Sequence, residues 1–393
     1  MARQGGKSLQ ILLFGMRPLT IDEVMRSAIV IDGHADTPQR FVDENFDLCD
    51  PLSGGNFNLE SAKRGNLGAE FFAIWAEPSR YMGQYASRTL ELIEAVKQQA
   101  AKHADEMELT TSAEGIERAH AQGKFAALIG IEGGHSIEVS LERLRQYYAL
   151  GARYMTLTWN NSNGWADSSG DINDASVPHT QDGLSSFGQD VVREMNRLGM
   201  MVDVSHVADR TFFSVLSVSR APVIASHSCA RALCASPRNI ADDMLRAMAS
   251  SGGVVMVNFY SAFVSQAYRD ALKMMQPEID AAVSKARAAG RALSAVDEAK
   301  IRRGMMDRIP RPPLAALIDH IDHVAKTAGI DHVGLGSDFD GVFGQLPEGI
   351  DSAADLAKIT VALMERGYSV QECRKVLGGN LLRVFREVEQ SKA

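Results

Sequence analysis

Short apolar runs alternate with amphipathic segments along most of this chain. The apolar runs have the length and the Val, Ile, Leu and Ala content of buried β-strands, and they cover residues 28–34, 68–75, 125–132, 154–159, 201–206, 222–227, 253–259 and 332–338. Between several of them apolar residues recur at helical spacing, in residues 81–104, 137–150, 185–198, 208–217 and 313–328. Each connection is long enough to return the chain for another parallel strand. The pattern therefore predicts an α/β fold, a TIM-like (β/α)8 barrel of the metal-dependent hydrolase type.

The same pattern predicts one catalytic domain. We expect residues 21–389 to form the barrel and residues 1–20 to form an N-terminal extension. Residues 266–311 are rich in Ala, Lys, Arg and Met and interrupt the alternation, so we expect a helical insertion there, on the side of the barrel that carries the active site. A lid, a dimer contact and a solvated helical excursion all remain open for this insertion.

Composition limits the classes of partner. The chain has 393 residues, of which 45% are hydrophobic and 23% are charged, as in an ordinary globular protein. A formal net charge of −8 without clustered Lys and Arg argues against nucleic-acid binding. The apolar stretch at residues 11–16 is too short to cross a bilayer, and we predict a cytoplasmic protein without a membrane partner. The four cysteines lack a CxxC spacing, which implies neither a thiolate zinc site nor a disulfide framework and leaves them as small buried apolar residues.

Polar side chains stand at the C-terminal tips of five predicted strands. These tips carry imidazole or carboxylate groups, the ligand types of zinc, and the residues are His34, Asp36, Glu132, His206, His227 and Asp338. The C-terminal ends of the strands form the active-site face of a (β/α)8 barrel. We therefore expect these side chains to gather around metal ions.

The first strand tip supplies two candidate ligands. His34 and Asp36 are two residues apart on an extended segment, so both side chains point to the same side. A hydrogen-bonded structural pair is the alternative. Glu132 ends a strand too apolar for an unpaired carboxylate, so it either bridges two ions or pairs with a Lys or Arg from a neighbouring strand.

His206 and His227 end successive strands, each after a serine. Either one alone is more typical of a structural histidine, but adjacent barrel strands place their tips within reach of one ion. The predicted site holds two Zn²⁺ ions per chain. His34, Asp36 and Glu132 bind one ion, and the bridging Glu132 binds the other together with the two histidines. Two such ions activate water and polarise a carbonyl.

Two further residues are candidates for catalysis and substrate binding. Single-metal barrel hydrolases place an aspartate ligand where Asp338 stands, but with the metal sites already filled we expect Asp338 to be a general acid or base. Arg238 follows the His227 strand, and its planar guanidinium can clamp a substrate carboxylate. A surface arginine is the alternative for that position.

Several motifs, taken together and in order, resemble the renal or membrane dipeptidase family, peptidase family M19. They are Ile31-Asp32-Gly33-His34-Ala35-Asp36, Glu132-Gly133-Gly134-His135-Ser136, Asp203-Val204-Ser205-His206, Ala225-Ser226-His227-Ser228 and Gly336-Ser337-Asp338-Phe339-Asp340-Gly341. The resemblance implies a binuclear-zinc barrel that hydrolyses dipeptides, often with a D-residue at the C-terminus. By position it implies the five metal ligands named above, Asp338 as the catalytic acid/base and Arg238 as the carboxylate-binding arginine. It also implies a homodimer and a small dipeptide as partners.

The chain departs from the family at one substrate-contacting position. Where the family commonly has a histidine, this sequence has Trp159, followed by Asn160 and Asn161. An indole donates a single hydrogen bond and carries no proton, so Trp159 and Asn160 are candidate substrate-binding residues with altered chemistry. An amidohydrolase acting on another amide or a cyclic substrate, and a metal-stabilised binding protein without catalysis, remain the alternatives.

Overall fold

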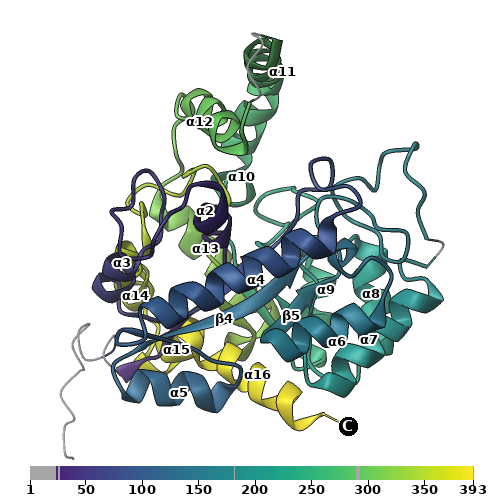
Figure 1. The fold of residues 1–393 in the computed structure, drawn as a ribbon. Helices are drawn as coiled ribbons and strands as arrows, with labels where there is room; N and C mark the ends of the chain where they lie inside the picture. Colours follow the sequence, from purple (N-terminus) through teal and green to yellow (C-terminus); the bar gives the residue numbers. More distant parts are fainter. Residues whose placement is uncertain (1–23, 25–26, 181, 289–292, 393) are drawn as a thin grey trace, which may run out of the picture.

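Parallel strands form a closed barrel in the part of the chain that the computed structural model describes, residues 24, 27–180, 182–288 and 293–392 (Figure 1). The barrel strands are β1 (Val30–Ala35), β2 (Leu67–Ile74), β4 (Phe125–Glu132), β5 (Ala152–Thr156), β6 (Met201–Asp203), β7 (Ile224–Ala225), β8 (Val254–Val257) and β9 (Val333–Leu335). Each strand pairs in parallel with its neighbour in the order β2-β1-β9-β8-β7-β6-β5-β4, and a pairing between β2 and β4 closes the ring. The predicted TIM-like (β/α)8 barrel is confirmed, and every predicted strand is present.

One short strand was not predicted from the sequence. β3 (Met107–Leu109) pairs with residues 125–127 of β4 and lies outside the closed ring. Three residues are too few to show the alternation of apolar and polar positions that is typical of a strand. The hydrophobic pattern therefore does not predict β3.

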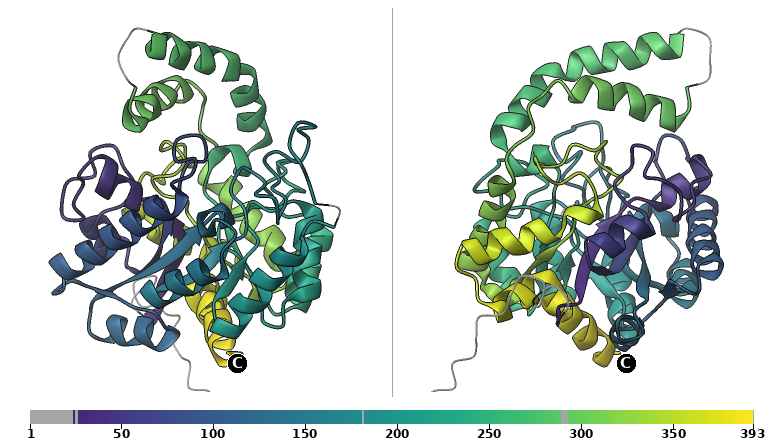
Figure 2. Two further views of the ribbon diagram at one scale, coloured as in Figure 1. Left: turned by 45° about the vertical axis from the view of Figure 1, so that its right-hand side comes forward. Right: turned by 90° about the vertical axis from the view of Figure 1, so that its left-hand side faces the viewer.

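Helices surround the barrel (Figures 1 and 2). The five predicted amphipathic segments all form helices: α4 (Tyr85–Lys102), α6 (Leu141–Leu150), α7 (Ser186–Leu198), α8 (Asp209–Val218) and α13 (Leu314–Ala328). Further helices are α2 (Pro38–Asp43), α3 (Leu59–Arg64), α5 (Ala113–Ala121), α9 (Asp242–Ser250), α10 (Ser261–Val264), α14 (Ala357–Glu365), α15 (Val370–Arg374) and α16 (Asn380–Gln390).

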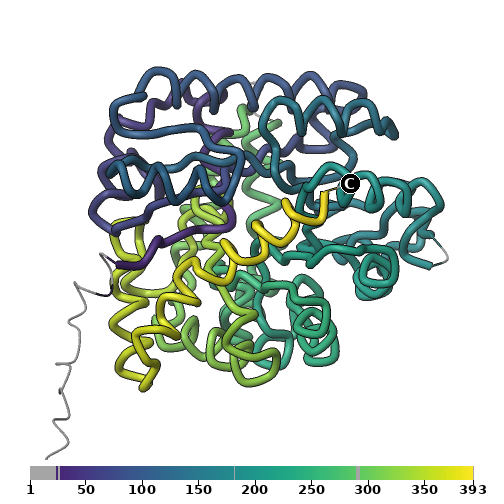
Figure 3. The backbone as a smooth tube through the Cα atoms, turned by 90° about the horizontal axis from the view of Figure 1, so that it is seen from below, coloured from purple at the N-terminus to yellow at the C-terminus, as the bar shows by residue number. Residues whose placement is uncertain are grey.

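The barrel interior is apolar at the end opposite the strand tips. Inward-facing strand residues alternate with outward-facing ones: Ile31, Phe71, Leu128 and Tyr154 pack in one buried cluster, and helix α16 contributes Phe385 to it. Viewed from below, the yellow helix α16 runs across this end of the barrel (Figure 3). Helix α16 thus covers the N-terminal end of the barrel, opposite the face at which the strands end.

Two helices occupy the range in which an insertion was expected. α11 (Gln266–Ala288) and α12 (Ala295–Met306) follow the last strand but one and extend away from the barrel (Figure 2). The predicted extension over residues 1–20 lies outside the described residues. Within the described chain, no helix combines the length and apolar character needed to cross a membrane.

Candidate metal centre

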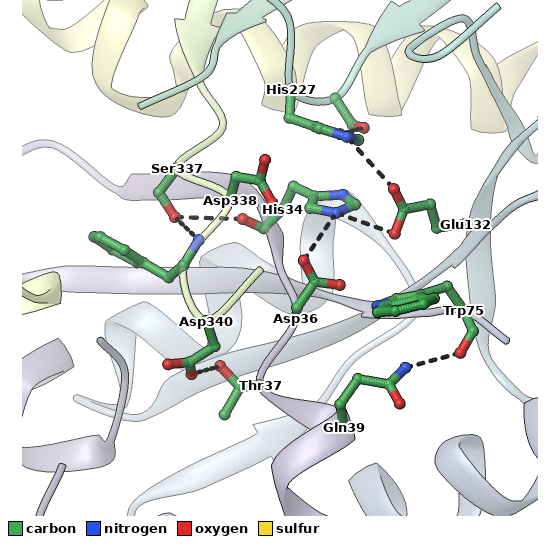
Figure 4. Close-up of polar contacts among 12 residues, drawn as sticks. His34, Asp36, Thr37, Gln39, Trp75, Glu132, His227, Ser337, Asp338 and Asp340 are labelled. Carbon is green, nitrogen blue, oxygen red and sulfur yellow. Dashed lines mark hydrogen bonds and ion pairs between the residues drawn. The ribbon is translucent and has the colours of Figure 1, made fainter. Parts of the chain in front are cut away.

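The six predicted strand-tip residues meet at the C-terminal end of the barrel, and all of them except His206 are labelled in Figure 4. All of them are buried, and they come from five different strands or the residues that follow them: His34, Asp36, Glu132, His206, His227 and Asp338. The parallel barrel brings them together because every strand ends at the same face.

Glu132 lies at the centre of the group. Its Oε2 is 3.5 Å from His34 Nε2, while its Oε1 is 2.9 Å from His206 Nε2 and 3.5 Å from His227 Nε2. His34 Nε2 also lies 3.9 Å from Asp36 Oδ2. Each oxygen of Glu132 therefore faces a different side of the site, as a bridging carboxylate must.

The imidazole rings of His34 and His206 are oriented by contacts at Nδ1, the nitrogen that faces away from Glu132. His34 Nδ1 lies 3.0 Å from the Tyr154 hydroxyl, and that hydroxyl donates to the Gly33 carbonyl at 3.3 Å. His206 Nδ1 lies 3.1 Å from Asn160 Oδ1, an acceptor. If each Nδ1 carries the proton, each Nε2 presents its lone pair to the centre of the site.

His227 is held by a short relay. Its Nδ1 lies 2.8 Å from Ser226 Oγ, which in turn donates to Asp203 Oδ2 at 2.6 Å. Asp203 also accepts from the backbone amides of Ser205 and Ser226. These hydrogen bonds orient the His227 ring as the rings of His34 and His206 are oriented, with Nε2 facing Glu132.

Several buried polar atoms at the centre of the site make no hydrogen bond, as ligands of a cation would. His34 Nε2 and Asp36 Oδ1 are buried without a hydrogen bond, and His206 Nε2 faces His227 Nε2 at 3.0 Å. Ligand atoms of His34, Glu132 and His227 lie within 4.8 Å of one another, and so do those of His34, Asp36 and Asp338. Buried imidazole and carboxylate atoms so arranged fit divalent cations.

The pKa shifts of two of the three imidazoles agree with this fit, and that of the third reflects the pull of the carboxylates. Burial, with the nearby Arg238 charge, lowers the pKa of His206 to about 4, and burial with the His34 charge lowers the pKa of His227. Both rings are therefore neutral, the form that binds a metal. Burial also opposes protonation of His34, but Glu132 outweighs it and raises the pKa of His34 to about 10. The carboxylates thus create a negative potential that attracts positive charge.

Asp338 lies beside the candidate ligands on a strained backbone. Its φ of 64° and the φ of 67° at His206 fall in the left-handed region, which is uncommon for residues other than glycine and is often found at functional sites. Asn258 Nδ2 donates to Asp338 Oδ2 at 2.8 Å. Gly341 leaves room for the carboxylates, because a Cβ there would lie 1.9 Å from Asp36 Oδ2 and 2.4 Å from Asp338 Oδ1.

Arg238 is buried rather than on the surface. Its Nη1 donates to Ser228 Oγ at 3.3 Å and its Nη2 to the His227 carbonyl at 3.2 Å, while Nε is buried without a partner. Burial lowers the pKa of Arg238 to about 10, against the opposing effect of Asp338. A buried guanidinium with long hydrogen bonds and a spare donor suits an incoming carboxylate.

Trp159 forms an aromatic wall with a second tryptophan. The Trp75 and Trp159 rings stack with centroids 4.9 Å apart, and Trp159 lies over His206 at 6.5 Å. Asn160 Oδ1 contacts Nδ1 of His206, so the Asn160 side chain orients the His206 ring. Its expected contact with substrate stays a prediction.

Four residues around the site were missed in the sequence. Asn258 and Trp75 each follow the end of a barrel strand, so the reasoning that identified the metal ligands applies to them as well. Asp203 is a carboxylate within an apolar strand, the signal that identified Glu132. Tyr154 carries no such signal, because a tyrosine in a strand is ordinary.

Comparisons with known proteins agree with these motifs. A model of the membrane dipeptidase family, peptidase family M19, matches residues 19–393. Dipeptidase 3 from Homo sapiens is 35% identical over 373 residues, which cover 93% of this chain and 66% of the human protein. Dipeptidase 3 from Mus musculus gives the same identity and coverage. The chain thus spans just under two thirds of the length of these relatives.

Solved structures share the fold. A probable dipeptidase from Pseudomonas aeruginosa aligns with a TM-score of 0.80 at 26% identity, covering 94% of this chain and 98% of that chain. A metallo peptidase from Rhodobacter sphaeroides, liganded with a phosphinate mimic of the dipeptide L-Ala-D-Ala, aligns with a TM-score of 0.72 at 23% identity, covering 92% and 99%.

Proposed function

This chain belongs to the membrane dipeptidase family, peptidase family M19, and on that premise we propose that it is a metal-dependent dipeptidase. The observation that carries the proposal is the convergence of three imidazole Nε2 atoms on the two oxygens of Glu132 at the C-terminal end of the barrel. The reaction is hydrolysis of the amide bond of a dipeptide.

The ligand set we propose holds two Zn²⁺ ions per chain. His34, Asp36 and Glu132 hold one ion, and Glu132, His206 and His227 hold the other. When bound, two such ions activate water and polarise the scissile carbonyl. The hydrogen bonds to each Nδ1 fix the ring orientations, and the apolar barrel beneath keeps bulk water from the ligands.

Asp338 handles the proton in this proposal. It accepts the proton of the attacking water and delivers it to the leaving nitrogen. Asn258 donates to Oδ2 of Asp338, which holds the carboxylate in place. Oδ1 of Asp338 carries no such amide contact and faces the neighbouring Asp36 across Gly341.

Arg238 binds the free carboxylate of the substrate. Its buried Nε has no protein partner and its two other contacts are long, so a carboxylate gains strong hydrogen bonds there without displacing strong ones. The Trp75–Trp159 wall borders the site near His206 and is the part of the site where we expect substrate selectivity to differ from other family members.

We propose dipeptides with a C-terminal D-residue among the substrates. A metallopeptidase of the same fold binds a mimic of L-Ala-D-Ala, which makes that dipeptide the first to test. A homodimer, tested by sedimentation, and a cytoplasmic location, tested by cell fractionation, are further proposals.

The test is hydrolysis by the purified protein combined with metal analysis. We expect about two zinc ions per chain, release of amino acids from L-Ala-D-Ala or L-Ala-L-Ala, and loss of this activity on chelation with recovery on adding Zn²⁺. A cyclic dipeptide serves as the control, because it has amide bonds but no free carboxylate. Hydrolysis of the cyclic compound alone would favour the amidohydrolase alternative, and no hydrolysis of any dipeptide by the zinc-loaded protein would refute the proposal.

A further inference from the structure

A second cluster of metal-ligand side chains lies away from the barrel mouth. Asp47 and Cys49 belong to the turn that follows α2, and His103 is the C-terminal cap of α4. Ligand atoms of the three side chains lie within 4.8 Å of one another. All four cysteines were expected to be buried, which is confirmed for Cys229, Cys234 and Cys373 and wrong for Cys49, which is exposed.

The hydrogen bonds determine which nitrogen of His103 is available. His103 Nε2 lies 2.8 Å from Asp47 Oδ1, and a carboxylate oxygen only accepts, so Nε2 carries the proton. Nδ1 then has a free lone pair and faces Cys49 Sγ at 3.4 Å. The other oxygen of Asp47 accepts from Lys102 Nζ at 2.5 Å. Asp47 therefore orients the ring and leaves the sulfur and Nδ1 as the free pair.

The separation of these two atoms suits a shared metal. Zinc bound to sulfur at about 2.3 Å and to nitrogen at about 2.0 Å, at a tetrahedral angle, places the two ligand atoms roughly 3.5 Å apart. The observed 3.4 Å needs almost no rearrangement. A carboxylate that receives the second N–H of a ligating imidazole is also the usual outer partner of a zinc-bound histidine.

The local charge favours a cation. His103 caps the C-terminal end of the 18-residue helix α4, where unpaired carbonyl groups carry partial negative charge. The carboxylates of Asp47 and Glu106 lie near the Cys49 sulfur, and the Lys102 ammonium, which donates to Asp47, is the opposing charge.

We propose that Cys49 Sγ and His103 Nδ1 bind a thiophilic divalent cation such as Zn²⁺, with Asp47 as the orienting partner and water completing the coordination. Binding replaces the thiol proton by the ion, so one proton is released for each ion bound. The bound ion links the turn at Asp47 to the end of α4, where Leu48 N already donates to Gln99 Oε1 at 3.0 Å. The elements involved supply no ligand to the barrel-mouth centre, and the proposal does not depend on the dipeptidase activity.

Cadmium titration of the zinc-loaded protein tests this site. Cd²⁺ is a stand-in for zinc whose bond to a thiolate produces a charge-transfer absorption in the ultraviolet, and none of the proposed barrel-mouth ligands contains sulfur. We expect one equivalent of this signal per chain as Cd²⁺ replaces Zn²⁺ at the sulfur, without net proton release, and protection of Cys49 from iodoacetamide as read by peptide mass. Asp47→Asn should weaken binding by about 10- to 100-fold, the usual effect of losing the partner of a metal-bound histidine.

Matched variants make the result decisive. Cys49→Ser should abolish the signal, and His103→Ala should weaken binding at least as much as Asp47→Asn. His323→Ala is the control, since His323 pairs with Asp242 at 2.7 Å in the same way but at another place, and it should bind Cd²⁺ like the parent protein. Circular dichroism confirms folding of each variant. Parent affinity in folded His103→Ala, a signal that persists in Cys49→Ser, or no signal in the parent protein would overturn the proposal.

Discussion

Arg238 provides the most direct test of the proposed substrate class. The perturbation combines two enzyme variants, Arg238→Lys and Arg238→Met, with two substrates, L-Ala-D-Ala and the same dipeptide amidated at its C-terminus. If Arg238 binds the free carboxylate, the enzyme change and the substrate change remove the same interaction. Their effects on kcat/KM should then fail to add.

The magnitude follows from the burial of the guanidinium. Arg238 is 7% exposed, and removing one partner of a buried, hydrogen-bonded ion pair costs about 3–5 kcal/mol. At about 1.4 kcal/mol for each factor of ten, Arg238→Met should lower kcat/KM for the free dipeptide by roughly 10²- to 10³-fold or more. Arg238→Lys keeps the charge but loses the planar fork, so we expect an intermediate loss.

The assay is steady-state hydrolysis followed by quantification of the released amino acids. Amidation of the substrate should lower kcat/KM of the parent enzyme about as much as Arg238→Met lowers it for the free dipeptide. In the Arg238→Met variant, amidation should lower kcat/KM little further. Metal content measured in parallel ensures that the variant still holds its ions. Equal turnover of free and amidated substrates by the parent enzyme, or fully additive losses, would refute a carboxylate clamp at Arg238.

Three other perturbations probe the proton, the metals and a buried carboxyl group on strand β2. Asp338→Asn should keep both metals yet reduce turnover by about 100-fold or more; loss of metal would instead identify Asp338 as a ligand. Glu132→Gln should lower the metal content of both sites whereas His206→Ala should empty mainly one, and elemental analysis showing a single ion insensitive to His206 would contradict the binuclear site. Burial and the neighbouring Asp32 raise the pKa of Glu70 above its ordinary value of 4.5. The folded state then holds the Glu70 proton more tightly than the unfolded state, so its contribution is fully present at low pH and is lost as pH rises through the folded pKa. Glu70→Gln should therefore flatten the decline in stability above pH 4.5, and urea unfolding at pH 5 and pH 8 with an unchanged difference would exclude this.

Much of the architecture follows from the sequence itself. Each barrel strand is an apolar run long enough to be buried on both faces, and each amphipathic segment has one apolar side, so local periodicity alone predicts which elements form. Since all parallel strands of a barrel end at one face, polar residues at the tips, such as His34, Glu132 and His227, must lie close together. This argument needs no knowledge of loop conformation, and the structure places these side chains together.

Other features depend on contacts between residues that are distant in the sequence. His34 contacts Tyr154 of another barrel strand, and Cys49 contacts His103 at the end of helix α4. Both contacts depend on how distant segments pack together. Arg238 has the sequence surroundings of a surface residue and is buried against residues distant in the sequence, among them Phe263 of helix α10. Local sequence determines which groups can ligate or donate, because that depends on side-chain chemistry and strand period. The tertiary structure decides which atom of each group is free to react, because a hydrogen bond from a remote residue occupies the other.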